Sequence, residues 1–143
     1  MAIPEEPGSS VREASREPVR SAAMQISNAV GHVHKQLVGR GPTNVRTHIN
    51  DDVILCLLEG GFTQAERTVW ENLGEEAVIE LRLRLQDAMR RAVVDAVETI
   101  VGRRVRSFMS ANDPEQDVQA EIMLLDSAAD AATHRPGGCL STS

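Results

Sequence analysis

Residues 39–66 read GRGPTNVRTHINDDVILCLLEGGFTQAE and contain two strand patterns, two turns and the start of a helix. Residues 44–50 alternate apolar and polar side chains, as a strand with one covered face does. Residues 50–52, Asn-Asp-Asp, are typical of a tight hairpin turn. Residues 53–58 are apolar without interruption. We therefore expect a β-hairpin in the middle of the chain, followed by a helix.

The apolar second strand needs cover on both of its faces. Antiparallel strands with one face in water alternate apolar and polar residues, and residues 53–58 do not. A helix, the C-terminal tail or a second subunit would each provide that cover. We expect a homodimer, and six residues are assigned to its interface: Ile26, Val33, Leu37, Ile54, Cys56 and Leu58.

Two helices are expected after the hairpin. Thr63 and Glu66 have the spacing of a capping box, in which each side chain bonds the backbone amide of the other. This predicts a short helix that ends near residue 73, and a long helix over residues 75–101 that Gly102 closes. Seven residues recur at helical spacing and are expected to face the core: Val78, Leu81, Leu85, Ala88, Ala92, Ala96 and Ile100. The opposite side carries Arg82, Arg90 and Arg91.

Another helix is expected before the hairpin, over residues 19–38, because Pro18 suits a first helical turn and Gly39 a helix end. Its apolar residues form a narrow stripe: Val19, Ala22, Ile26, Ala29 or Val30, Val33 and Leu37. The stripe can pack on the protein's own sheet or pair with the same helix of a second subunit, and packing on the sheet is the preferred interpretation.

Two further strands are expected near the C-terminus, over residues 103–110 and 117–125, with a turn at 112–114. The last strand carries four apolar residues on one face: Val118, Ala120, Ile122 and Leu124. The predicted fold class is α+β, a mostly antiparallel four-stranded sheet of two hairpins with helices packed on one face, in the order α-β-β-α-α-β-β. We expect one domain over residues 18–127, between disordered tails at 1–17 and 128–143.

The charge and composition exclude several functions. The net charge is −6, which disfavours a polyanion binder, and aromatic residues make up only 2% of the chain, which disfavours base stacking. No nucleic-acid partner is expected. Residues 82–106 are rich in arginine; a GC-rich genome explains this composition, and a face for an acidic partner is the alternative.

A cytoplasmic location without direct membrane insertion is expected. The N-terminus lacks the apolar core of a signal peptide, and no apolar run approaches the length of a membrane span. Two cysteines do not make a disulfide framework. Cys56 is expected as a small buried hydrophobe.

No catalytic residue, metal site or cofactor is predicted. His48 with Asp51 or Asp52 could act as a base and its orienting group, but no nucleophile accompanies them by motif. His32 and His34 lack the spacing of zinc ligands. Four residues would form a cationic groove for a carboxylate, bicarbonate or phosphate if two strands share a face: Arg46, His48, Arg104 and Arg106.

Four motifs within residues 20–125 carry a family resemblance: GxGP from Gly39, EGG from Glu59, TxxER from Thr63 and SxNDP from Ser110. The chain resembles the MpsC-like family, a former domain of unknown function named after the third component of a sodium-translocating membrane-potential-generating system. The resemblance implies a soluble accessory protein near a cation-linked bicarbonate or membrane-energy system. It carries over no catalytic residues.

The function expected from the sequence is a non-enzymatic accessory or regulatory module, dimeric, whose partner is a membrane transport complex. The alternative is a small-anion-binding protein or minor enzyme that uses the cationic strand residues Arg46, His48, Arg104 and Arg106.

Overall fold

Three helices and four strands make up the computed structural model, which describes residues 9–127, with side chains from residue 18 onward. The elements are α1 (Ser9–Val38), β1 (Asn44–Asn50), β2 (Val53–Glu59), α2 (Gln64–Leu73), α3 (Glu75–Val101), β3 (Val105–Asp113) and β4 (Val118–Leu125). The predicted α+β class and element order are confirmed. The predicted tail at 128–143, with Cys139, and the first eight residues of the other tail lie outside the described residues.

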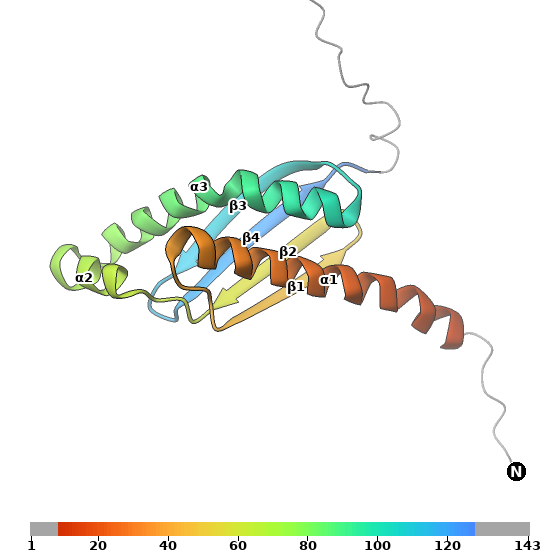
Figure 1. The fold of residues 1–143 in the computed structure, drawn as a ribbon, viewed down its shortest axis with the longest axis horizontal. Coiled ribbons are helices and arrows are strands. Elements are labelled where there is room, and N and C mark those ends of the chain that lie inside the picture. Colours follow the sequence, from red (N-terminus) through yellow and green to blue (C-terminus); the bar gives the residue numbers. More distant parts are fainter. Residues whose placement is uncertain (1–8, 128–143) are drawn as a thin grey trace, which may run out of the picture.

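The sheet is antiparallel throughout and has the order β1-β2-β4-β3. The two hairpins therefore meet at β2 and β4, the central strands. The long helices α1 and α3 lie side by side across one face of the sheet, and α2 lies beyond one end of the strands (Figure 1). The core forms between these helices and the covered face, from Ile26 and Val30 of α1, Val93 and Val97 of α3, and strand residues such as Ile54.

Local signals account for most element ends. Thr63 and Glu66 form both bonds of the capping box at the start of α2. Gly102 ends α3 with φ of 67° and donates its amide to the carbonyl of Glu98, a left-handed conformation that glycine adopts without strain. Asp51 takes a positive φ of 52° in the β1–β2 turn, as aspartate tolerates in such turns.

Helix α1 begins ten residues earlier than Val19, the predicted start, and Pro18 lies inside it. The preceding residues include Arg12, Glu13 and Ala14, which favour a helix. Pro18 works against this extension, because an interior proline removes one backbone donor and its ring crowds the carbonyl four residues earlier. The N-terminal part of α1 extends past the end of the sheet (Figure 1).

The predicted core stripe of α3 is correct at Val78, and Leu85 and Ile100 pack against the core. Over the rest of the helix the prediction is displaced by about one residue, a rotation of roughly 100°. The buried residues are Val78, Arg82, Gln86, Met89, Val93 and Val97. Arg82, expected on the solvent side, is 1% exposed. The cause is a set of polar partners at one end of the sheet, described below.

Of the two faces of β4, the one that the helices cover is the less apolar. The residues beneath the helices are Gln119, Glu121, Met123 and Leu125, and Glu121 is fully buried. The four apolar residues expected to share a face, Val118, Ala120, Ile122 and Leu124, do share one, and it is the face without helices.

Candidate functional site

The sheet has a second face, which neither long helix covers (Figure 1). In β2 the residues Ile54, Cys56 and Leu58 are buried beneath the helices, so the alternate residues point to the other side. Three cross-strand pairs between β2 and β4 form the centre of that side: Val53–Leu124, Leu55–Ile122 and Leu57–Ala120. We call these six residues the open-face patch.

The margins of the open-face patch differ in chemistry. On the β1 side, Arg46 and His48 lie opposite Leu57 and Leu55, and both are exposed. Arg46 forms an ion pair with Glu59 at the end of β2. On the β3 side, Met109 is 46% exposed. An apolar centre with a polar margin is the usual anatomy of a protein–protein interface.

Most of the residues expected at a dimer interface are instead buried within the single chain. Ile26, Val33, Ile54, Cys56 and Leu58 are buried inside the single chain. Leu37 is 56% exposed near the end of α1. The five buried residues face the protein's own helices or sheet, because the covered face of β2 contains Ile54, Cys56 and Leu58. A dimer surface that uses β2 must therefore involve the opposite face.

The structure does not bring the expected cationic groove together. Arg46 and His48 lie on β1, whereas Arg106 lies on β3, and these strands are the two edges of the sheet. Three strand spacings, about 14 Å in all, separate them. Arg104 directly precedes β3 and so lies at the same edge of the sheet as Arg106. Arg46 is engaged by Glu59.

His48 is also not joined to the aspartates that could have oriented it as a base. Within residues 18–127, His48 forms no hydrogen bond or ion pair with Asp51 or Asp52.

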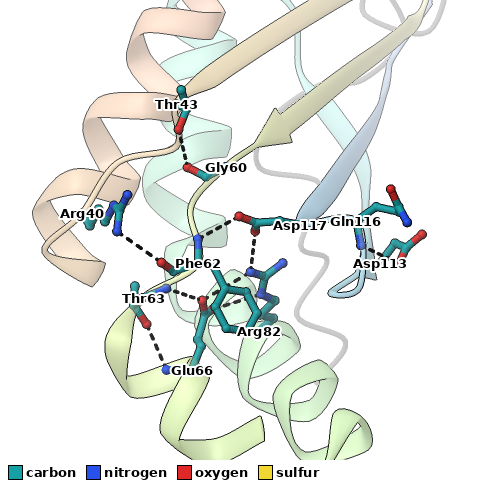
Figure 2. Close-up of polar contacts among 10 residues, drawn as sticks. All are labelled: Arg40, Thr43, Gly60, Phe62, Thr63, Glu66, Arg82, Asp113, Gln116 and Asp117. Carbon is teal, nitrogen blue, oxygen red and sulfur yellow. Dashed lines mark hydrogen bonds and ion pairs between the residues drawn. The ribbon is translucent and has the colours of Figure 1, made fainter.

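A buried ionic cluster lies at the α2 end of the sheet, centred on Arg82 of α3 (Figure 2). Its Nε atom donates to Oε1 of Glu66 at 3.0 Å, and its Nη2 atom donates to Oδ1 of Asp117 at 2.8 Å. Arg82 is 1% and Glu66 3% exposed. Three elements, α2, α3 and the turn before β4, are thereby joined through one guanidinium group.

Local geometry prepares both carboxylates of this Arg82 cluster. Glu66 holds its place through the capping box, where Oε2 accepts the amide of Thr63 at 2.9 Å. Asp117 has a positive φ of 52°, and its Oδ2 atom accepts the amide of Phe62 at 3.1 Å. Bonds from backbone amides therefore help to hold both carboxylates where they bind the guanidinium.

The electrostatics of the cluster favour a permanently charged Arg82. Burial alone would lower the pKa of Arg82, but its hydrogen bonds to Glu66 and Asp117 and their negative charges raise that pKa overall. Two carboxylates share one guanidinium, so the cluster carries a net charge of −1 when all three groups are ionised. Ions buried this deeply need such partners, because removal from water is costly.

A small cavity adjoins the cluster beneath the helices. It has a volume of about 20 Å³, and its lining combines polar residues such as Arg82, Glu66 and His34 with apolar ones such as Leu58 and Met89. Beside it, Nε2 of His34 on α1 lies 3.2 Å from Oε1 of Glu121 on β4. Room of this size accommodates about one water molecule, not an organic substrate.

Cys56 lies on the covered face and is not a nucleophile. Burial is the main reason that the pKa of its thiol rises to about 12, so the reactive thiolate does not form near neutral pH. Its Sγ atom lies 3.5 Å from Oγ1 of Thr47. The expectation of a small buried hydrophobe at this position is confirmed.

Local sequence motifs did not indicate the Arg82 cluster or the His34–Glu121 pair. The capping box identified Glu66 as a helix start, but its second role depends on Arg82, which lies 16 residues further on. His34 and Glu121 are 87 residues apart. Neither pair has a local sequence signal.

Among residues 9–127, no three His, Cys, Asp or Glu side chains gather closely enough to hold a metal ion. No helix in this part of the chain has the length and apolar character needed to cross a membrane.

These features define an α+β protein with an antiparallel sheet, helices on one face and an ionic cluster at one end. A family model described as Na+-translocating membrane potential-generating system (MpsC) matches residues 20–127. The chain belongs to this family, as its motifs predicted. It is also similar to an uncharacterized protein, YbcI of Bacillus subtilis strain 168, with 30% identity over 89 residues, which cover 62% of this chain and 72% of that protein. No solved structure gives a significant match.

Proposed function

We propose that this protein is a non-enzymatic, cytoplasmic accessory module of a Na+-translocating membrane-potential-generating system, and that it works as a homodimer. The family description motivates the link to Na+ translocation. The open-face patch is the single observation that carries the dimer. The buried Cys56, whose pKa burial raises to about 12, agrees with a binding role in place of catalysis.

The arrangement of the open-face patch supports pairing of two copies. Leu55 and Ile122 lie at its centre, each on a central strand. In a dimer with two-fold symmetry, the patch of one copy faces the same patch of the other. The two apolar centres would then be in contact, and the two sheets would stack about 10 Å apart. Val53 is 37% exposed and the other five patch residues are half-buried, so the apolar surface that they still present would leave water, at about 25 cal/mol per Å².

The size of the face is sufficient for a modest dimer. Four strands about 4.8 Å apart and seven residues of about 3.3 Å each give a footprint of roughly 440 Å² per copy. Side-chain relief increases the accessible area beyond this footprint. Two copies give a footprint of roughly 880 Å² in total, below the roughly 1,200 Å² where stable specific interfaces begin, so the expected pair is a weak one.

Light scattering coupled to size exclusion tests the dimer. We expect the wild-type chain at tens of micromolar to have twice the chain mass, and Leu57→Lys to have the mass of one chain. Leu83→Lys is the matched control, because Leu83 is 41% exposed on α3 and lies outside the patch. A monomeric wild-type protein, or a Leu57→Lys variant that stays dimeric, would refute the open-face dimer.

The link to Na+ translocation needs a separate test. Membrane vesicles from cells that lack this protein should generate a smaller Na+-dependent membrane potential, read with a potential-sensitive dye, and added wild-type protein should restore it. A potential that is unaffected by loss of the protein would refute the proposed association.

A further inference from the structure

An open groove of about 420 Å³ lies between α2 and the turn before β4, next to the Arg82 cluster, with which it shares Asp117. Phe62 and Trp70 form one wall, and Pro114 with Glu115 forms the other. The groove is at the end of the sheet, so it is separate from the open-face patch. Nothing in the proposed dimer uses it.

The groove gathers most of the protein's aromatic side chains. The chain has two phenylalanines, one tryptophan and no tyrosine, and Phe62 and Trp70 are two of these three. Their ring centres are 5.8 Å apart and the ring planes meet at 60°, an edge-to-face arrangement that holds both rings in defined positions. Both residues remain half-buried and accessible from the groove.

The charged residues around these rings are mainly acidic. Glu71 and Glu115 line the groove and are exposed, and neither forms an ion pair or hydrogen bond within residues 18–127. Asp117 is also part of the lining, but Arg82 already engages it. The positive lining residue is Arg67. Two carboxylates beside aromatic rings are thus available to a cation.

The protein itself shows which cation suits these surroundings. The guanidinium carbon of Arg82 lies 5.2 Å from the centre of the Phe62 ring while its nitrogens bond Glu66 and Asp117. The guanidinium of Arg67 lies 5.9 Å from the same ring. Planar guanidinium groups both stack on aromatic rings and bond carboxylates in a fork.

We propose that this groove binds an arginine side chain from a segment of a partner protein. The groove is shallow and open to solvent, whereas sites for small molecules bury most of their ligand, so a chain that passes across the groove fits it better than a free cation. The arginine would stack beside Trp70 and reach Glu71 and Glu115 with its nitrogens.

Trp70 is the only tryptophan in a chain without tyrosine, so intrinsic fluorescence reports directly on this groove. The probe is a blocked peptide, Gly-Arg-Gly-Arg-Gly, and its control carries uncharged citrulline in place of arginine. At low salt we expect the arginine peptide to change Trp70 emission with a dissociation constant in roughly the millimolar range or tighter, and added salt to weaken it. The citrulline peptide should leave the emission unchanged.

Two charge variants and one control identify the site. Glu71→Gln and Glu115→Gln should each weaken binding by about two- to fivefold, as expected for exposed charge pairs. Asp95→Asn, an exposed residue of α3 that does not line the groove, should bind like the wild type. An unchanged emission with the arginine peptide, equal responses to both peptides, or equal binding by all three variants would overturn the proposal.

A free cation provides the last comparison. If spermidine changes Trp70 emission as strongly as the arginine peptide does, the groove is a site for small cations and the proposed peptide partner is wrong. A much weaker response to spermidine supports the arginine-bearing segment. Neither result depends on the oligomeric state or on Na+ translocation.

Discussion

Replacement of Arg82 by methionine should be among the most damaging single changes in this protein. Methionine keeps much of the side-chain volume but removes the charge that two carboxylates share. Glu66, 3% exposed, would lose its 3.0 Å bond to Nε and remain buried without a counter-ion. Removing one partner of a buried ion pair costs about 3–5 kcal/mol. The side chain of Asp117 is 28% exposed and can turn to water, so we expect the lower end, about 3 kcal/mol.

The loss of the ring contact adds to this cost. The Arg82 guanidinium lies over Phe62 at 5.2 Å, and such contacts contribute about 0.5–1 kcal/mol. A total near 3.5 kcal/mol is a large part of the 5–15 kcal/mol that stabilises a typical domain. At roughly 4 °C for each kcal/mol in a domain of this size, the midpoint of thermal unfolding should fall by about 14 °C.

Urea unfolding followed by circular dichroism, with Arg84→Met as the matched control, measures the effect. Arg84 lies two residues further on the same helix and pairs with Glu80, but its side chain is 78% exposed, so its replacement should cost under about 0.5 kcal/mol. Equal costs for the two variants would refute the account of Arg82 as the centre of a buried cluster. A double variant with Glu66→Gln should recover part of the loss, because the unpaired charge is then removed.

Two further predictions concern Cys56 and the glycines. Burial raises the pKa of Cys56 from 9.0 to about 12, so between these pH values only the thiol of the unfolded chain ionises. In that window the free energy of unfolding of the wild type should fall by about 1.4 kcal/mol per pH unit relative to that of Cys56→Ala. Urea titrations of both proteins at pH 8 and 10 measure this, and equal changes in the two would contradict it. Gly60 has φ of 68°, and an added Cβ there would lie 2.4 Å from Oγ1 of Thr43. Gly102 has a similar φ of 67°, but the space around it is open, so Gly102→Ala should cost only the backbone strain of about 1–2 kcal/mol and Gly60→Ala should cost more. Urea unfolding that ranks the two variants in the reverse order would contradict the prediction.

The limits of several elements followed from local signals. The alternation over Asn44–Asn50 predicted β1 without error, and the capping box at Thr63 placed α2 correctly. Glycines at helix ends did the same for α3. Each signal acts within a few residues, so one sequence is enough to recognise it.

The sides that these elements turn to the core did not follow from local signals. Arg82 is buried because Asp117, 35 residues away, meets it, and Glu121 is buried because His34 on α1 lies beside it. A hydrophobic stripe treats every charged residue as exposed, so it placed most of α3 about one residue out of register. The alternation in β4 correctly predicted that Val118, Ala120, Ile122 and Leu124 share one face. It did not predict that this face has no covering helix, because that depends on which side of the sheet α1 and α3 occupy.

The Arg82 cluster and the groove beside Trp70 show the same limit. Capping and turn patterns indicated that Glu66 and Asp117 lie at element ends, and no pattern indicated that both meet one arginine. The aromatic wall of the groove involves Phe62 and Trp70, eight residues apart on a loop and a helix, whereas Pro114 joins them from the other hairpin. Only the tertiary fold brings these parts together.

The position of β4 in the sheet has a consequence for biosynthesis. β4 is the last strand in sequence, yet it lies between β2 and β3. On the ribosome, the N-terminal hairpin emerges first and leaves the apolar strand β2 with an unpaired edge until residues 118–125 have been made. Such edges recruit other chains, and folding that waits for distant pairing is slow. Nascent chains stalled before β4 should therefore depend on chaperones in a way that completed chains do not.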